Sequence, residues 1–529
     1  MSTQPTGQAR KFQTLGDIPR GYAAERPDAA AMKFEGRTTS YQTLDAHSNQ
    51  IANALIAAGV KTGDRVGYLG KNTDYFFEVL FGAAKLGAVT LPIGWRLAAG
   101  EVAHIVRDGE VDLLFVGAEF DELAEAAVAE VGRAVRLIAM ESEGADGFAA
   151  WRDGADARDP GIDIKPSDVT LQLYTSGTTG FPKGVMLTHD NLLGMWSAAG
   201  DEDFSWFQWD GDDVCLVAMP VSHVGGTSWA IVSFLYGASA LIVREFNPPQ
   251  ILQLMAPEKI SKLFLVPAAL NFLIQMPGAR EVDYSHLKVI FYGASPIPLH
   301  LLRACIDVFG CRFAQQYGMT EAAGTIVYLP PEDHEVDGNR RMRSAGLPMP
   351  GVELKIIDAD GAALPADTVG EICVRSACVM KGYWNNEAAT RETIDAHGWL
   401  RSGDAGYLDE DGYLYIHDRV KDMIISGAEN IYPAEVESAV FGHPAIAEVA
   451  VIGVPDDTWG EAVKAVIALK PGSEATEADI LAFVRTRIAG FKVPKSVDFV
   501  DALPRNATGK VLKRALREPY WAGKDRAVN

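Results

Sequence analysis

The chain has 529 residues, more than one hydrophobic core usually organises, so two or more domains are expected. Apolar residues make up 48% and charged residues 22%, as in ordinary globular enzymes, and the formal net charge is −22. This acidic balance argues against nucleic acid or an anionic membrane as the main partner, because both are negatively charged. An anionic ligand would therefore have to meet positive charge that is local.

The cysteines and the N-terminus give the predicted compartment. Five cysteines without a Cys-x-x-Cys pair are typical of reduced core thiols in a cytoplasmic protein. Residues 1–12 lack the apolar core of a signal peptide. The longest apolar stretch, 229–243, is interrupted by Ser and Gly and is short for a bilayer crossing. We expect it to form a buried helix and a strand, and we predict no transmembrane segment.

Strand and helix patterns alternate through the first 140 residues. Ser40 can cap a helix that ends near Gly59, and a second helix runs through Phe76 and stops at Gly87. Strands are expected at 66–69, 88–91, 111–116 and 135–140. This alternation predicts an α/β fold, in which helices cover both faces of a largely parallel sheet.

A loop rich in small residues follows, in the stretch LYTSGTTGFPKGVMLTH from Leu173 to His189. Small residues let successive backbone N–H groups curl around an anion, and Lys183 adds a charge suited to phosphate. Gly177, Gly180 and Lys183 are spaced differently from the mononucleotide P-loop. The pattern therefore predicts a different phosphate-binding loop between two strands, and a flexible loop without a ligand is the alternative.

The central third contains strands that end in glycine and small polar residues. Strands are expected at 214–218, 262–266, 288–292 and 313–320. The first leads into MPVSHVGG (219–226) and the third into Gly-Ala-Ser-Pro (293–296). Such strand ends are typical of a ligand crevice at the carboxyl edge of a sheet.

The last third changes in texture. From Gly351, short strands with turn signals at 358–361 and 409–412 predict an antiparallel region. Past Asp418 we expect a small separate α+β unit. Its predicted helices are 434–441 and 477–488, and its predicted strands are 447–454, 462–469 and 496–499.

Five motifs, in this order, resemble those of the acyl-adenylate-forming superfamily, which includes acyl-CoA synthetases, luciferases and peptide-synthetase adenylation domains. They are YTSGTTGFPKG (174–184), QYGMTE (316–321), RSGDAGYLDEDGYLYIHDR (401–419), ISGAENIYP (425–433) and PRNATGK (504–510). The resemblance implies that a carboxylic acid attacks the α-phosphate of ATP, giving acyl-AMP and pyrophosphate, after which a thiol usually takes the acyl group. It also implies a large N-terminal AMP-binding domain over 1–419, with layered, mostly parallel sheets, and a small mobile C-terminal domain over 420–529 that carries the catalytic lysine.

The resemblance assigns ATP and AMP to residues from several motifs. These are Thr175, Ser176, Gly177, Thr178, Thr179, Gly180, Lys183, Gly293, Ala294, Ser295, Gln316, Tyr317, Gly318, Met319, Thr320, Asp404, Arg419 and Lys510. Tyr317 is expected to stack on adenine, and Asp404 and Arg419 to bind the ribose. Taken singly, these three residues also fit a core tyrosine, a turn aspartate and a surface ion pair.

The catalytic and metal assignments follow from charge. A carboxylate that approaches a triphosphate is repelled, so Mg²⁺ and cations are needed. The resemblance assigns Mg²⁺ to Glu321 and Thr320, and catalysis to Lys510, His223 and Lys183. Alone, Glu321 also fits an acid at a helix start, Lys510 a solvated lysine and His223 a core histidine.

The resemblance further predicts a pocket, a tunnel and a hinge. The acyl pocket comprises His223, Val224, Gly225, Gly226 and Gln316, the coenzyme A tunnel Ser426, Gly427 and Ala428, and the hinge Lys421. Many relatives have glycine at positions 316 and 428. The side chain of Gln316 leaves the pocket depth open, and one methyl group at Ala428 is expected to narrow the tunnel without closing it.

Together these features predict an AMP-forming acid–CoA ligase that uses ATP, Mg²⁺ and coenzyme A and acts on a fatty acid. An acceptor such as a carrier protein or an amine stays open, as do aryl, branched and thioether acids and a homodimer. Positions 222 and 223 are Ser and His where peptide synthetases have Phe-Asp, which disfavours an amino acid substrate. A non-catalytic ATP-binding protein would have no need of Lys510.

Overall fold

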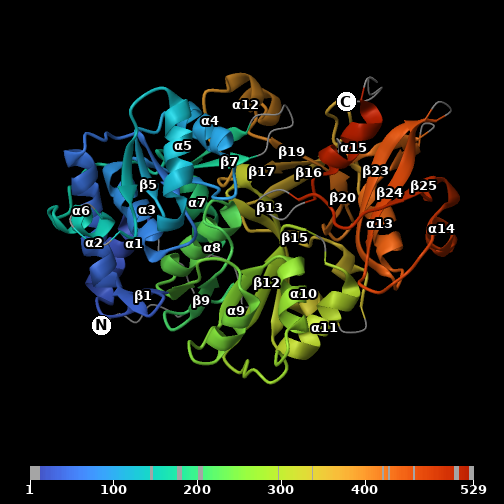
Figure 1. The fold of residues 1–529 in the computed structure, drawn as a ribbon, viewed down its shortest axis with the longest axis horizontal. Coiled ribbons are helices and arrows are strands. Elements are labelled where there is room, and N and C mark those ends of the chain that lie inside the picture. Colours follow the sequence, from blue (N-terminus) through green and yellow to red (C-terminus); the bar gives the residue numbers. More distant parts are fainter. Residues whose placement is uncertain are drawn as a thin grey trace. The chain divides into compact units, whose positions relative to one another are not determined.

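The computed structural model describes residues 12–142, 144, 147–175, 182–199, 207–295, 297–335, 338–419, 422–426, 429–456, 459–505 and 511–522. The chain forms a large unit, Met1–Leu354 with Val374–Leu400, and a small unit, Lys355–Cys373 with Arg401–Asn529 (Figure 1). The predicted α/β class, with a large N-terminal part and a smaller C-terminal part, is confirmed. The domain boundary at residue 419 stays a prediction.

The first sheet of the large unit has seven strands in the order β18-β8-β7-β4-β3-β5-β6. Its strands are β3 (Arg65–Leu69), β4 (Val89–Ile93), β5 (Leu113–Val116), β6 (Arg136–Ala139), β7 (Val169–Thr175), β8 (Lys183–Thr188) and β18 (Gly382–Tyr383). The strands β4, β3, β5 and β6 run parallel, whereas β7 and β8 form an antiparallel pair in which Thr175 lies opposite Lys183. The predicted pair of strands around the small-residue loop is thus confirmed.

The second sheet of the large unit has nine strands in the order β15-β14-β13-β12-β11-β9-β10-β1-β2. They are β1 (Ala30–Phe34), β2 (Arg37–Ser40), β9 (Val214–Val217), β10 (Ser239–Ile242), β11 (Lys262–Leu265), β12 (Val289–Gly293), β13 (Arg312–Met319), β14 (Gly324–Leu329) and β15 (Leu347–Pro348). The N-terminal strand β1 pairs in parallel with β10, so that Met32 lies opposite Ala240. Strands β1 and β2 therefore belong to the second sheet, although residues 41–213 intervene before its other strands.

Twelve helices of the large unit lie in the described residues. They are α1 (Asp17–Glu25), α2 (Tyr41–Ala57), α3 (Asp74–Leu86), α4 (Ala99–Asp108), α5 (Asp121–Val131), α6 (Phe148–Asp153), α7 (His189–Ala199), α8 (Val224–Leu235), α9 (Pro248–Met255), α10 (Pro267–Gln275), α11 (Leu299–Phe309) and α12 (Glu387–Thr393). The predicted start of α2 and the predicted end of α3 are confirmed, and neighbouring residues determine both. The Ser40 hydroxyl accepts a hydrogen bond from the Thr43 amide at 3.1 Å, and Gly87, with φ +80°, ends α3.

Two apolar helices, α3 and α8, connect the sheets. Helix α3 contacts β4 of the first sheet, and α8 contacts β9 and β10 of the second. The ring of Phe234 on α8 lies 5.4 Å from Phe77 and 5.2 Å from Phe81 on α3, centre to centre. A helix buried on most sides has no polar face, which explains the apolar stretch at 229–243. The prediction of a buried helix and strand there is confirmed.

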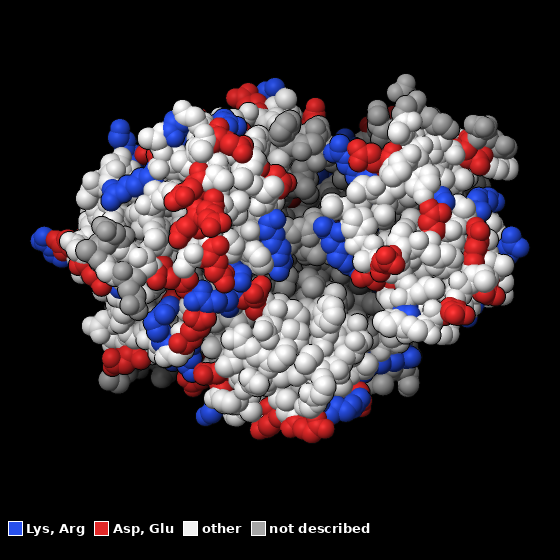
Figure 2. Space-filling view, viewed as in Figure 1, with Lys and Arg blue, Asp and Glu red and all other residues white. Residues whose placement is uncertain are grey.

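Helices α9, α10 and α11 pack together against the second sheet (Figure 1). Leu270 and Leu302 share a buried cluster there with Leu263 of β11 and Phe313 of β13. Neither α9 nor α10 contains a charged residue. Figure 2 accordingly shows a broad area without charge over these helices. Phe272 on α10 is 58% exposed. In the part of the chain that the structure describes, no helix has the length and apolar character that a membrane crossing requires.

The small unit contains the predicted antiparallel and α+β regions. A four-stranded sheet, β16-β17-β19-β20, lies almost entirely within it, next in sequence to a five-stranded sheet. The elements are β16 (Glu353–Ile357), β17 (Gly370–Arg375), β19 (Leu400–Leu408), β20 (Leu414–Arg419), β21 (Ile424–Ser426), β22 (Glu429–Ile431), α13 (Pro433–Phe441), β23 (Ile446–Asp456), β24 (Gly460–Leu469), α14 (Glu477–Arg485), β25 (Ser496–Phe499) and α15 (Lys513–Trp521). Helix α14 ends at Arg485, before the predicted residue 488, because a turn follows in which the Arg487 amide donates to the Val484 carbonyl.

Candidate nucleotide and acid site

Glu321 lies at the centre of a group of side chains from separate segments. It belongs to a short 3-10 helix, Thr320–Ala322, directly after β13, and is 9% exposed. The Thr175 hydroxyl at the end of β7 donates to Glu321 Oε1 at 3.3 Å. The Tyr383 hydroxyl in β18 donates to the same oxygen at 3.1 Å. The carboxylate predicted to hold Mg²⁺ is therefore hydrogen-bonded to β7, which leads into the small-residue loop, and to β18, which pairs with β8.

Lys183 joins this group through an aromatic ring. It begins β8, opposite Thr175, and its Nζ lies 5.0 Å from the centre of the Tyr383 ring. Tyr383 therefore contacts both the predicted metal-binding carboxylate and the predicted phosphate-binding cation. No sequence motif singles out Tyr383 as a functional residue. Its position depends on the short pairing of β18 with β8, which no local pattern indicates.

The ends of β12 and β13 bring together the residues predicted to line the adenine slot. Gly293 lies opposite Gln316, and a Cβ on Gly293 would stand 2.1 Å from the Gln316 carbonyl oxygen. A Cβ on Gly318 would stand 1.7 Å from the carbonyl oxygen of Gly324 in β14. Both glycines are required because two backbones approach closely. Ala294 has a φ of +64°, so the strand end turns sharply beside the partly buried Tyr317.

The start of α8 carries the predicted acyl-pocket residues. His223 precedes the helix and is partly buried, and Gly225 packs so closely that a Cβ there would be 3.2 Å from the Phe264 ring. Val224 Cγ2 lies 3.7 Å from where a Cβ on Gly324 would be. Gly324 begins β14, two residues after the short helix Thr320–Ala322 that carries Glu321. The predicted acid residues thus adjoin the predicted nucleotide residues within the large unit.

The small unit carries other predicted residues. Asp404 on β19 is buried, its amide donates to the Ser402 hydroxyl at 3.0 Å, and it lies opposite Arg419 on β20. The two predicted ribose residues are therefore neighbours in one sheet. Ser426 ends β21. The remaining predicted residues lie outside the described residues, so their roles stay predictions; they are Ser176, Gly177, Thr178, Thr179, Gly180, Lys421, Gly427, Ala428 and Lys510.

The chemistry at Glu321 fits a magnesium ion. In the described part of the chain, no group of three or more His, Cys, Asp or Glu side chains is arranged to hold a metal. Mg²⁺ does not need such a cage, because it often takes one or two carboxylates and completes its shell with phosphate and water oxygens. A buried carboxylate held by two hydroxyl groups is a suitable hard ligand.

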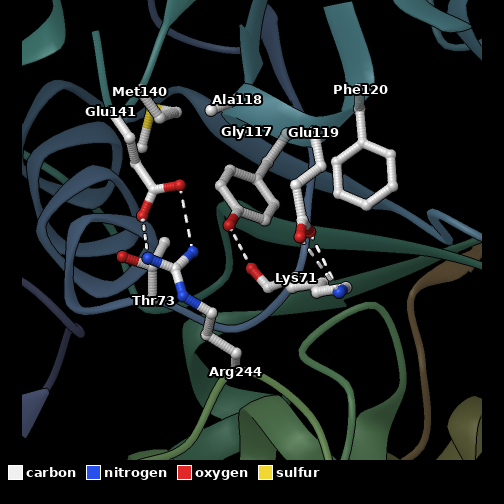
Figure 3. A pocket seen from close by; sticks show the side chains of 10 residues that line it. Lys71, Thr73, Gly117, Ala118, Glu119, Phe120, Met140, Glu141 and Arg244 are labelled. Carbon is white, nitrogen blue, oxygen red and sulfur yellow. Dashed lines mark hydrogen bonds and ion pairs between the residues drawn. The ribbon is translucent and has the colours of Figure 1, made fainter. Parts of the chain in front are cut away.

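A separate hollow lies where β3, β5 and β10 end, and it is lined by Tyr68, Lys71, Thr73, Gly117, Ala118, Glu119, Phe120, Met140, Glu141 and Arg244. Figure 3 shows its two cations turned toward carboxylates. Arg244 pairs with Glu141 at 2.7 Å, and Lys71 with Glu119 at 3.0 Å. Cations that are already paired offer little charge to a phosphate, so this hollow has the character of a structural ion-pair site.

Comparison with known proteins decides the family. Residues 20–384 match the model of the AMP-binding enzyme family, and residues 435–510 match the AMP-binding enzyme C-terminal domain. The chain belongs to the AMP-binding enzyme family. A fatty acid–[acyl-carrier-protein] ligase from Streptomyces coeruleorubidus is 41% identical over 98% of this chain and 99% of its own. A feruloyl-CoA synthase from an Amycolatopsis species is 38% identical over 96% and 99%. The crystal structure of ATP-bound MatB from Rhodopseudomonas palustris matches with a TM-score of 0.86 and 32% identity, over 96% of this chain and 99% of that one.

As a member of the AMP-binding enzyme family, the chain is an adenylate-forming acid ligase that binds ATP. The predicted superfamily and the predicted enzyme class are confirmed. The family therefore gives the class of reaction. The acid and the acceptor of this chain are proposed in the next subsection.

Proposed function

We propose that the chain activates a fatty acid as acyl-AMP with release of pyrophosphate and then transfers the acyl group to coenzyme A. One observation carries the proposal: Thr175 and Tyr383 both donate to the buried Glu321, and Lys183 lies beside the Tyr383 ring. A triphosphate needs a hard carboxylate for its metal ion, a lysine for its charge and a loop of N–H donors for its oxygens. The cluster provides the first two at the base of the predicted phosphate loop.

Each residue has a role in this proposal. Mg²⁺, held by Glu321 and Thr320, would neutralise phosphate charge. Thr175 and Tyr383 hold the Glu321 carboxylate in one orientation, and Lys183 adds positive charge beside the Tyr383 ring. His223 would lie beside the acid, and Lys510 would bring a cation to the α-phosphate when the carboxylate attacks.

The surroundings of α8 support an apolar acid. Gly225 lies against Phe264, whose ring centre is 6.1 Å from that of Trp229. The Trp229 ring is in turn 5.1 Å from Phe291. An acyl chain that passes the first turn of α8 would therefore meet aromatic carbon rather than charge. The acid named for the 41% identical relative is a fatty acid.

Five free cysteines support the proposal of a cytoplasmic location.

An aryl acid is the second candidate. The Ser228 hydroxyl, one turn along α8 from Val224, is buried and has no hydrogen-bond partner among the described residues. A buried hydroxyl without a partner is costly, and a phenolic group on a substrate would supply one. The 38% identical relative is named for feruloyl-CoA. An acyl carrier protein is the alternative acceptor, since the 41% identical relative is named as a ligase of that acceptor.

A screen of pyrophosphate release tests these proposals. ATP and Mg²⁺ are combined with octanoate, palmitate, ferulate or malonate, first alone and then with coenzyme A or a phosphopantetheinylated acyl carrier protein. We expect the fatty acids to give the highest rates and coenzyme A to take the acyl group. Fastest release with ferulate would favour the aryl candidate, and turnover with the carrier protein alone would change the acceptor. No release with any acid would contradict the proposed function.

Lys510→Ala is the matched inactive variant for this screen. It should lower pyrophosphate release by about 10²–10³-fold, because it removes a cation from the phosphate at which charge develops. It should still form the thioester from supplied acyl-AMP and coenzyme A. A variant that adenylates at nearly the normal rate would show that the role assigned to Lys510 is wrong.

A further inference from the structure

Asn72 is a buried amide that joins the two sheets of the large unit. It follows β3 of the first sheet and is 2% exposed. Its Nδ2 donates to the carbonyl oxygens of Met219 and Val243, both at 3.1 Å, and its Oδ1 accepts from the Val221 amide at 2.9 Å. Those three partners follow β9 and β10 of the second sheet. One side chain thus satisfies two carbonyl groups and one N–H group of another sheet.

The segment that Asn72 holds leads to His223. Residues 219–223 connect β9 to α8, and the His223 amide donates to the Pro220 carbonyl at 3.0 Å. The Thr227 hydroxyl donates to the Val221 carbonyl at 2.6 Å, and a Cβ on Gly226 would be 2.2 Å from the Pro220 carbonyl oxygen. The segment and the first turn of α8 therefore form one closely packed piece, which Asn72 ties to the first sheet.

The residues around Asn72 provide a firm support. Figure 3 shows Lys71 turned toward Glu119 and Arg244 turned toward Glu141, and the Tyr68 hydroxyl donates to the Lys71 carbonyl. The backbone N–H of Asn72 donates to the Arg244 carbonyl at 3.0 Å. A side chain anchored on both sides can fix the position of a neighbouring loop. Aspartate could not replace it, because a carboxylate offers no donor to the carbonyls of Met219 and Val243.

We propose that Asn72 is a positioning residue for the acid: it sets where His223 and the first turn of α8 stand, without touching the substrate. The inference rests on the proposed function, which assigns His223 to the acid. The nucleotide cluster at Glu321 is held by Thr175 and Tyr383, which come from other segments. Loss of the Asn72 side chain should therefore raise the KM for the acid and leave the KM for ATP unchanged.

The experiment compares Asn72→Ala and Asn72→Asp with Asn49→Ala. Asn49 is also a buried amide (5% exposed), but its Nδ2 donates to the Ala157 carbonyl at 3.1 Å and its Oδ1 accepts from Lys85 Nζ at 2.6 Å. Pyrophosphate release is measured with the most active of octanoate, palmitate, ferulate and malonate. We expect both Asn72 variants to raise the KM for the acid about tenfold or more, with the KM for ATP within about twofold of normal, because hydrogen bonds that position the acid residues are lost. Asn49→Ala should change neither KM.

Hydrogen–deuterium exchange of the peptide 219–227 provides a readout that needs no activity. Exchange should become about tenfold faster in the Asn72 variants and stay normal in Asn49→Ala. In a His223→Ala background, Asn72→Ala should raise the acid KM by less than about twofold, because the two residues act through the same piece of structure.

The outcomes separate the two proposals. Unchanged exchange in the Asn72 variants, equal rises in both KM values, or the same KM change in Asn49→Ala would overturn the positioning role. Faster exchange with an unchanged acid KM would also overturn it, because the segment would then be held without consequence for the acid. If the normal enzyme releases pyrophosphate with none of the acids, the proposed function fails, and exchange alone decides whether Asn72 fixes residues 219–227.

Discussion

Two hydroxyl groups decide the direction in which the Glu321 carboxylate points. Thr175 and Tyr383 both donate to its Oε1, at 3.3 and 3.1 Å. If Glu321 holds Mg²⁺ as proposed, a carboxylate fixed in this way would lose little conformational freedom when the ion binds, because outer partners of a ligand usually affect metal affinity strongly. Tyr383 is the more informative of the two, because its ring also lies beside Lys183.

Tyr383→Phe should therefore increase the requirement for Mg²⁺. The variant keeps the ring beside Lys183 and loses only the hydroxyl that donates to Glu321. We expect the Mg²⁺ concentration at half-maximal pyrophosphate release to rise about tenfold. Tyr41→Phe is the control, since this buried hydroxyl donates to the Ala238 carbonyl at 2.8 Å, away from Glu321. The same Mg²⁺ dependence in both variants would contradict the role given to Tyr383.

A second residue connects stability with pH. His189 is fully buried, its Nδ1 accepts from the Leu15 amide at 3.0 Å, and burial lowers its pKa from 6.5 to about 4. In the unfolded chain the ring takes up a proton near pH 6.5, so its contribution to stability is present above that pH and is lost as pH falls toward 4. Between pH 7 and pH 5 this residue should lower the free energy of unfolding by about 2 kcal/mol.

Urea unfolding at the two pH values measures this contribution. The loss of stability between pH 7 and pH 5 should be about 2 kcal/mol smaller in His189→Gln than in the normal protein. His286→Gln, at an exposed position, should lose as much as the normal protein does. An identical loss in His189→Gln would show that this ring does not cause the acid sensitivity.

At the scale of elements, the β13–β14 pair depends on one close approach. The register shifts between Tyr317 and Gly318, where a Cβ would stand 1.7 Å from the Gly324 carbonyl oxygen. Gly318→Ala must separate the two strands that flank Glu321. We expect it to abolish pyrophosphate release and to lower the free energy of unfolding by about 3 kcal/mol.

Gly100→Ala on α4 is the matched control. A Cβ there would lie 3.5 Å from Glu130 Oε2, an ordinary contact with the end of a side chain, so activity and stability should stay near normal. Normal pyrophosphate release in Gly318→Ala would mean that the two strands separate without disturbing Glu321.

Local chemistry explains which elements the sequence could predict. The Ser40 cap and the end of α3 at Gly87 depend on neighbouring residues, and both predictions are confirmed. The pairing of β1 with β10 joins segments far apart in the chain, and no periodicity indicates it. The same holds for Tyr383 and Asn72, which look like loop residues in the sequence. Tyr383 is positioned by the pairing of β18 with β8, and Asn72 by the segments that follow β9 and β10. The residues predicted to bind ligands could be named only from the family motifs, because a single Glu, His or Asp in a sequence does not reveal whether it binds a ligand.

At the scale of the whole molecule, the predicted residues are divided between two units. Glu321, Lys183 and His223 belong to the large unit, while Asp404 and Ser426 belong to the small one. If the predicted roles hold, the two proposed half-reactions would need different surfaces of the small domain, with Lys510 used for adenylation and the predicted tunnel at Ser426 used for the thiol. A large rotation between the two steps would present each in turn.

Lys421→Pro should separate the two half-reactions. Lys421, which lies outside the described residues, is the hinge that the resemblance to the family predicts. Proline fixes φ at roughly −65° and so prevents a large change of backbone angle. We expect one half-reaction to survive and the other to fail, while Lys421→Ala retains both. Adenylation is followed by pyrophosphate release, and thioester formation by the reaction of supplied acyl-AMP with coenzyme A. Normal rates of both half-reactions in the proline variant would show that the hinge is not at Lys421.

The parallel pairing of β1 with β10 has a consequence for the newborn chain. Residues 30–34 leave the ribosome about 200 residues before their partner, 239–242, which at about 5–20 residues per second means a delay on the order of 10–40 s. During that time Met32 and Phe34, both buried in the finished sheet, have no parallel partner strand to cover them. The second sheet therefore cannot be completed in the order of synthesis. Strand β1 can take its place beside β10 only after residues 239–242 have been synthesised.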